Sequence, residues 1–129
     1  MSDATSTAER LLASSAFALA TSEKRAALLP TLEELTRKHH RDCEIYRRLV
    51  DRVFGGLPKE TYARIEDVPF IPVSLFKQFE LRSIPSADIF RVLTSSGTTG
   101  QAVSRVILDR ETAALQGKAL VKIMQHFIG

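Results

Sequence analysis

The residues best suited to chemistry lie in a polar loop between two apolar runs in the last third of the chain. Gly97 and Gly100 allow the backbone to approach a ligand closely and to adopt φ angles that other residues avoid. Successive backbone N–H groups in such a loop can surround an anion, and hydroxyl groups can rotate to donate to phosphate oxygens. The sequence therefore predicts a polyphosphate-binding loop. Its residues are Thr94, Ser95, Ser96, Gly97, Thr98, Thr99 and Gly100.

The spacing of this loop differs from that of both common phosphate motifs. Gly97 and Gly100 are too close together for a Walker loop, and no Lys-Ser or Lys-Thr pair follows them. The dinucleotide-binding fingerprint is excluded as well, because its glycine spacing and its strand-to-helix setting are both missing. By composition alone, a polar hairpin loop that binds nothing explains these residues equally well.

Helical patterns dominate residues 1–56. Thr-Ser-Glu at 21–23 predicts a helix N-cap followed by an acidic first turn. Pro30 predicts the start of a further helix, because a missing N–H costs little in the first turn. Gly55 and Gly56 predict the end of that helix. Its apolar positions recur at steps of three and four residues. They are Leu32, Leu35, His39, Cys43, Tyr46, Leu49, Val50 and Val53.

The remaining chain predicts an α/β arrangement. Pro58, Pro69 and Pro72 favour a connector over residues 57–88, of which residues 68–72 should be extended and buried and residues 75–79 a short helical turn. Residues 89–93 and 102–108 read as two strands, so residues 89–108 form a β-hairpin that carries the loop. Asp109 then predicts the N-cap of a final helix over residues 109–129.

Composition narrows the class of protein. The chain has 129 residues, a net charge of +3 and opposite charges interspersed along its helices, which argues against nucleic-acid binding. One cysteine excludes an internal disulfide and a multi-thiolate zinc site, and no metal site is predicted. Residues 11–20 resemble a signal peptide, but acidic residues precede them, so a cytoplasmic location is expected. No apolar run is long enough to span a bilayer.

Other reactive side chains have ordinary structural explanations. We expect His39 at the edge of the core and His40 in solvent rather than a metal or acid–base pair. Cys43 at an apolar helical position reads as a small buried side chain. Lys77 reads equally well as a surface lysine or as a contact near the site. The arginines at 47, 48 and 52 are diluted by neighbouring acids.

The loop and the segment before it resemble a known superfamily. Residues 95–100, Ser-Ser-Gly-Thr-Thr-Gly, resemble the phosphate loop of adenylate-forming enzymes such as acyl-CoA synthetases and phenylacetate-CoA ligases. Within that superfamily the chain is similar to the Lux-type acyl-protein synthetases, the fatty acid–protein ligases of bacterial bioluminescence. The segments that carry this similarity are residues 38–40, 46, 68–77, 95–101, 107–109 and 112–116.

The resemblance implies ATP and Mg²⁺ as cofactors and a carboxylic, fatty acid as substrate. The acid would be activated as an acyl-adenylate and the acyl group passed to a cysteine, with acyl-transfer proteins as partners. Ala102 and Val103 depart from the Pro-Lys that many adenylating enzymes carry after the loop. The catalytic residues stay unassigned, because the superfamily's adenine, magnesium and acid contacts lie beyond this loop.

The chain therefore reads as part of the N-terminal domain of a longer enzyme and should be inactive alone. Two strands make a marginal sheet, and little is left to cover the apolar face of the last helix. That uncovered face also predicts self-association into a homodimer. Two alternatives remain open. One is aromatic-acid activation like that of phenylacetate-CoA ligases, and the other is a helical interaction module whose loop binds nothing.

Overall fold

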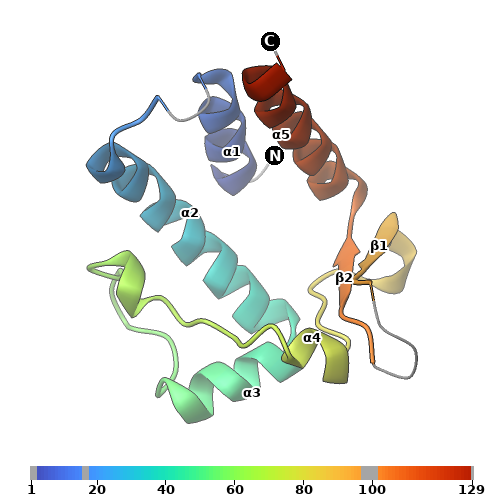
Figure 1. The fold of residues 1–129 in the computed structure, drawn as a ribbon. Coiled ribbons are helices and arrows are strands. Elements are labelled where there is room, and N and C mark those ends of the chain that lie inside the picture. The colour runs from blue at the N-terminus through green and yellow to red at the C-terminus, as the bar shows by residue number, and fades with distance from the viewer. Residues whose placement is uncertain (1–2, 16–17, 97–101, 129) are drawn as a thin grey trace.

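A computed structural model describes residues 3–15, 18–96 and 102–128, with side chains from residue 7 onward. The described part is mixed α/β, as predicted: five α-helices, two 3₁₀ turns and one two-stranded sheet (Figure 1). Two helices open the chain, α1 (Asp3–Ala13) and α2 (Thr21–Asp42), and α3 (Glu44–Val53) follows. Helix α1 contacts both α2 and the last helix, α5 (Arg110–Ile128).

Helix α2 begins nine residues before Pro30, so the prediction that Pro30 starts a new helix is wrong. Pro30 lies inside a continuous helix, where it leaves the carbonyl of Ala26 without its usual donor. The ring lines the groove between α1 and α2, beside Leu11. Packing against α1 therefore supports the helix through a position where local preference alone would end it.

The predicted N-cap of α2 is also one residue late. Thr21 is the first helical residue, and Ala20 occupies the N-cap position with an extended backbone. The side chain of Glu23 accepts a hydrogen bond from the N–H of Ala20 at 3.1 Å. Only this half of a capping box is present, since alanine has no side-chain acceptor. The acidic residue predicted in the first turn is Glu23, as expected.

The single helix predicted from residue 30 to residue 53 is broken at Cys43. Cys43 is extended (φ −122°, ψ 106°), ends α2 and begins α3. Its N–H donates to His39 O and its carbonyl accepts from Arg47 N–H, both at 2.9 Å, so the break leaves neither group unpaired. The apolar spacing continues across the break, which explains why the pattern hides it.

Helix α3 ends where the glycines predict. Phe54 caps it, and Gly55 (φ 75°) and Gly56 (φ 92°) follow in the left-handed conformation that favours glycine. The core of the described chain is small and centres on the α2–α3 junction. Val50 is fully buried, and Cys43 and Thr36 are almost so.

The connector includes the 3₁₀ turn η1 (Ile65–Asp67), helix α4 (Leu75–Gln78) and the 3₁₀ turn η2 (Ser86–Asp88). Helix α4 confirms the predicted helical turn. Residues 69–72 belong to no helix or strand, and the prediction that residues 68–72 are buried is only partly right. Pro69 is buried, whereas Phe70 is 72% exposed and rests edge-on against Phe54 at 5.6 Å.

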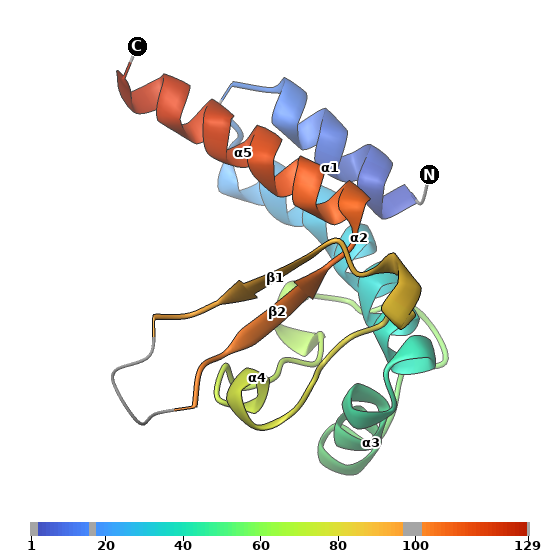
Figure 2. The ribbon, with the colours of Figure 1, turned by 90° about the vertical axis from the view of Figure 1, so that its right-hand side faces the viewer.

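The sheet is the antiparallel hairpin β1 (Arg91–Thr94) and β2 (Arg105–Leu108). Its register pairs Arg91 with Leu108 and Thr94 with Arg105. Both strands are shorter than predicted. Helix α4 contacts β2 and lies beneath it in Figure 2, while α5 leaves the far end of β2 toward α1. The hairpin is thus held at the end where β2 leads into α5.

Helix α5 starts as predicted at the Asp109 cap, whose Oδ1 accepts the N–H of Thr112 at 2.7 Å. Its apolar side chains are largely uncovered in the described part of the chain. The most exposed are Leu120, Val121, Ile123, Met124, Phe127 and Ile128. The sequence-based expectation of an uncovered helix face is therefore confirmed, while the expected homodimer stays a prediction.

Candidate functional site

The structure describes the base of the predicted phosphate loop. Thr94 is the last residue of β1, and Ser95 and Ser96 follow it as exposed, irregular chain. The other four predicted site residues lie outside the described residues. They are Gly97, Thr98, Thr99 and Gly100. The geometry of the site therefore rests on the two strands and on Ser95, Ser96 and Ser104.

Ser95 and Ser104 continue the strand pairing by one step beyond Thr94 and Arg105. The N–H of Ser95 donates to Ser104 O at 3.1 Å, as in an ordinary antiparallel pair. The return bond differs, because the N–H of Ser104 donates to Ser95 Oγ at 3.0 Å rather than to the Ser95 carbonyl. A side chain thus closes the base of the loop, and we call these two residues the loop neck.

In this pairing the hydroxyl group of Ser95 can act both as a hydrogen-bond acceptor and as a donor. Its oxygen accepts the Ser104 N–H, while its O–H proton still has freedom to donate to another acceptor. Ser104 is only 8% exposed, so its N–H depends on this bond. The neck therefore positions the first residues of the loop without using up the donor that a phosphate oxygen would need.

Charge around the neck favours anions. Residues 89–108 contain two arginines, at positions 91 and 105, and no Asp or Glu. Arg105 is exposed and sits directly across from Thr94. Arg91 lies at the other end of the ladder, where its guanidinium stands 5.7 Å from the centre of the Phe90 ring. The hairpin thus carries uncompensated positive charge in its own sequence.

The far end of the hairpin is fixed by packing. Leu108 is buried, and the N–H of Phe90 donates to its carbonyl at 2.9 Å. The guanidinium of Arg110, the first residue of α5, lies over the Phe90 ring at 4.3 Å. These contacts join β1, β2 and α5, so the strand ends that lead into the loop start from a fixed base.

The histidine pair is arranged opposite to the prediction. His39 is exposed, with its Nδ1 2.6 Å from Ser83 Oγ, whereas the side chain of His40 is 20% exposed. His40 Nε2 lies 2.7 Å from Asp51 Oδ1 on α3. The break at Cys43 turns α3 back toward α2, and this brings Asp51 to His40. Both histidines therefore have structural contacts, His39 with Ser83 and His40 with Asp51.

The other candidate residues lie outside the loop. Cys43 is 6% exposed at the α2–α3 junction, which confirms the prediction of a buried side chain. Lys77 is an exposed residue of α4. Arg48 pairs with Glu44 within α3, whereas Arg47 of α3 donates to the carbonyl of Arg41 on α2.

Sequence reasoning missed the role of Arg37. Its guanidinium pairs with Glu33 Oε1 and donates to the carbonyl of Glu60, both at 2.8 Å, which ties the connector to α2. The hydroxyl of Tyr62 lies near this pair, buried and without a partner among the described residues, and burial raises its pKa. The Glu33–Arg37 spacing of four residues was visible in the sequence, but its contact with the connector was not.

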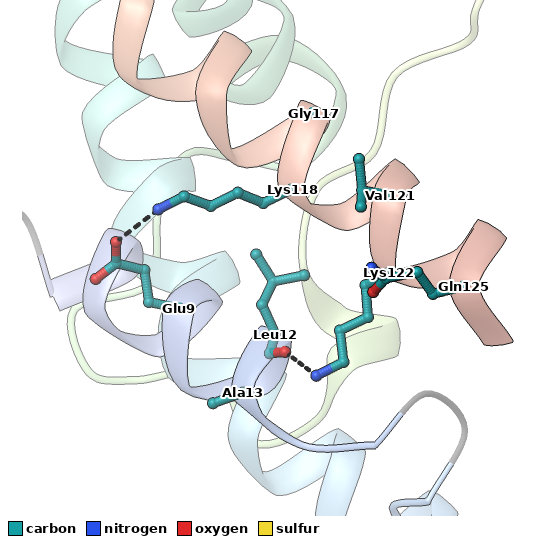
Figure 3. A pocket seen from close by; sticks show the side chains of 8 residues that line it. All are labelled: Glu9, Leu12, Ala13, Gly117, Lys118, Val121, Lys122 and Gln125. Atoms are coloured by element: carbon teal, nitrogen blue, oxygen red, sulfur yellow. Dashed lines mark hydrogen bonds and ion pairs between the residues drawn. The ribbon is translucent and has the colours of Figure 1, made fainter. Parts of the chain in front are cut away.

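Two grooves also border α1. The larger, of about 500 Å³, lies between α1 and α5 (Figure 3). Lys118 pairs across it with Glu9 at 3.6 Å, and Lys122 donates to the carbonyl of Leu12 in the last turn of α1. The charged groups of this groove are thus engaged in holding two helices together.

In residues 3–15, 18–96 and 102–128, no group of three or more His, Cys, Asp or Glu side chains is placed to hold a metal ion. Within the same part of the chain, no helix combines the length and the apolar character needed to cross a bilayer.

Comparison with known proteins identifies the family. Searches of curated proteins and of solved structures found no match. A family model described as acyl-protein synthetase, LuxE, matches residues 2–129, which is nearly the whole sequence. The match includes the hairpin, its loop and the helical region before it. This chain therefore belongs to the LuxE acyl-protein synthetase family.

Proposed function

We propose that this chain supplies the ATP phosphate loop of an acyl-protein synthetase of the adenylate-forming type. In this proposal a fatty acid carboxylate attacks the α-phosphate of ATP, which forms an acyl-adenylate and releases pyrophosphate. The acyl group then passes to a cysteine thiolate, which forms a thioester and releases AMP. The observation that carries the proposal is the neck: two serines join the strands of an acid-free hairpin at the point where a loop rich in glycine and hydroxyl groups begins.

The chain's own residues would hold the departing phosphates. The O–H of Ser95 can donate to a phosphate oxygen while its oxygen keeps the Ser104 N–H. The positive hairpin favours the negative charge that builds on the leaving group. The serine hydroxyls at the loop base fit a polyphosphate better than a metal, because a hydroxyl can donate to a phosphate oxygen. Mg²⁺ would be held mainly by phosphate oxygens, and there it would neutralise charge on the leaving pyrophosphate.

We also propose that Cys43 is not the acyl acceptor. It is the one cysteine of the sequence, and at 6% exposure it lies inside the α2–α3 junction. An accepting thiolate must reach the activated carbonyl, whereas Cys43 can do so only if the small core opens. The proposed acceptor is therefore a cysteine outside residues 1–129. Cys43→Ser in the complete enzyme should leave acyl transfer intact.

ATP binding by this chain tests the phosphate loop. Calorimetry with MgATP should show binding that Gly100→Val abolishes, because a β-branched side chain would block close approach of phosphate to the backbone. Gly117→Val on α5 is the matched glycine control, since a Cβ there meets no atom within 4 Å. Equal binding by wild type, Gly100→Val and Gly117→Val would remove the support for the loop.

The identity of the acid needs a second assay. Exchange of labelled pyrophosphate into ATP by the complete enzyme should depend on added fatty acid. Exchange that responds to an aromatic acid and not to a fatty acid would favour the phenylacetate-CoA ligase-like alternative.

A further inference from the structure

The groove between α1 and α5 combines an apolar lining with two lysines (Figure 3). Leu12 and Ala13 of α1 and Val121 of α5 supply apolar surface, and Gly117 lines the groove without a side chain. A Cβ at Gly117 would meet no atom within 4 Å, so the space beside this residue is open. The volume of about 500 Å³ lies within the roughly 300–1,000 Å³ of small-molecule sites. The groove therefore has room for a small apolar ligand.

Positive charge exceeds negative charge along this groove. Lys118 and Lys122 line it together with one carboxylate, that of Glu9. Lys118 Nζ lies 3.6 Å from Glu9 Oε1, and because the two side chains are 63% and 42% exposed, this ion pair is weak. Lys122 donates to the neutral carbonyl of Leu12, and no carboxylate pairs with it in the part of the chain that the structure describes. An anion beside Lys122 would therefore meet a positive charge that Glu9 does not balance.

We propose that this groove binds a fatty acid anion, with the carboxylate on Lys122 and the hydrocarbon chain along Leu12 and Val121. The choice of a fatty acid rests on the function proposed above. The need for an apolar chain with one negative end follows from the groove itself, since its apolar lining favours hydrocarbon and its excess charge favours an anion. An ammonium has three donors, so Lys122 can keep its bond to the Leu12 carbonyl while it binds a carboxylate oxygen.

This groove is separate from the loop neck. The described residues that line it all belong to α1 and α5. Helix α5 leaves the strand pair at the Leu108 end, whereas the neck lies beyond the opposite end, at Thr94 and Arg105 (Figure 2). The groove is thus a holding site that keeps the poorly soluble substrate on the protein, and not the place where its carboxylate reacts.

Four variants of the 129-residue chain test the groove. Gly117→Leu fills the open space beside the glycine, and Lys122→Gln removes the charge while it keeps a donor for the Leu12 carbonyl. Glu9→Gln removes the competing carboxylate. Leu120→Ala is the control, because Leu120 is 59% exposed on the same helix and is not part of the groove lining. Binding of decanoate and of decanol is measured by calorimetry at low ionic strength without nucleotide, after circular dichroism has confirmed equal helix content.

The expected result is a pattern of affinities across the two ligands. Wild type should bind decanoate about fivefold more tightly than decanol, the scale of one exposed ion pair. Lys122→Gln should bind the two ligands equally, and Glu9→Gln should tighten the binding of decanoate alone. Gly117→Leu should lose both ligands and keep the MgATP affinity of wild type, whereas Leu120→Ala should match wild type throughout. The preference for decanoate should shrink as salt is added, because exposed charges are screened.

Different results overturn the inference in recognisable ways. Equal affinity of wild type for decanoate and decanol would show that Lys122 binds no carboxylate. Equal losses in Leu120→Ala and Gly117→Leu would place the ligand on the uncovered outer face of α5 instead of in the groove. A dimer that Gly117→Leu dissociates in light scattering, with no decanoate bound to wild type, would mean that a second copy fills the groove.

Failure of the groove and failure of the proposed function can be told apart. If wild type binds MgATP but no decanoate, the groove inference fails while the phosphate loop stands. If decanoate binding depends on Gly117 and Lys122 while the complete enzyme shows no pyrophosphate exchange dependent on fatty acid, the groove stands and the proposed function fails.

Discussion

Replacing Ser95 with alanine removes the hydroxyl that accepts the N–H of Ser104 at 3.0 Å. Alanine leaves the backbone of the loop neck unchanged, so the bond from Ser95 N–H to Ser104 O can remain. The change therefore isolates the side-chain half of the neck. Ser96→Ala is the matched control, because Ser96 is the adjacent exposed serine and makes none of the hydrogen bonds of the neck.

The magnitude follows from the burial of Ser104. A buried donor left without an acceptor costs about 1–3 kcal/mol, and a net neutral hydrogen bond contributes about 0.5–1.5 kcal/mol. Ser104 retains 8% exposure, so water can partly replace the lost acceptor. We therefore expect the lower part of that range, about 1.4 kcal/mol, for opening of the neck. That free energy corresponds to about a tenfold change in the opening equilibrium.

Amide hydrogen exchange measured by NMR reports this opening directly. The Ser104 amide should exchange about ten times faster in Ser95→Ala than in wild type, while Ser96→Ala should leave it unchanged. Amides of α2 should exchange equally in all three proteins, which would show that the effect is local. An unchanged Ser104 exchange rate in Ser95→Ala would refute the reasoning, because the hydroxyl would then contribute nothing to the neck.

Two further predictions concern stability. Asp109→Ala should lower the free energy of unfolding, measured in urea, by about 1 kcal/mol, because Asp109 Oδ1 caps the N–H of Thr112. Asp109→Asn should retain most of this stability, since asparagine also caps helices. Equal losses in the two variants would mean that charge rather than capping matters. Burial raises the pKa of Tyr46 above its ordinary value near 10, so the unfolded chain loses that proton first and stability falls as pH rises from about 10 through the folded-state pKa. Tyr46→Phe should make this alkaline loss shallower in denaturant titrations, and an identical pH dependence would contradict the assignment.

Predictions from the sequence were right for features that depend only on residues close together in the chain. The stop at Gly55 and Gly56 and the Asp109 cap both depend on backbone geometry within a few residues. Side chains and glycines at such positions favour one conformation whatever packs around them. The phosphate loop stays a prediction, since four of its residues lie outside the described structure.

Local rules failed where a distant contact changed the outcome. Pro30 would end a helix in isolation, but α1 packs against this part of α2 and the helix continues. The sequence predicts that His40 is solvated, but the break at Cys43 turns α3 so that Asp51 Oδ1 lies 2.7 Å from His40 Nε2. The exposure of Phe70 likewise depends on what the connector packs against, because an apolar run does not show which of its side chains will be covered.

The sequence by itself determined the order of the elements, the position of the hairpin and the chemical character of its loop, because each depends on local backbone preference and residue type. Only the tertiary structure decided how the loop base is closed. Its register places Ser95 beside Ser104 and Arg105 beside Thr94, and register depends on pairing between residues about ten positions apart. The described structure therefore adds two features to what the sequence shows of the loop, namely a closed neck and an arginine on the facing strand.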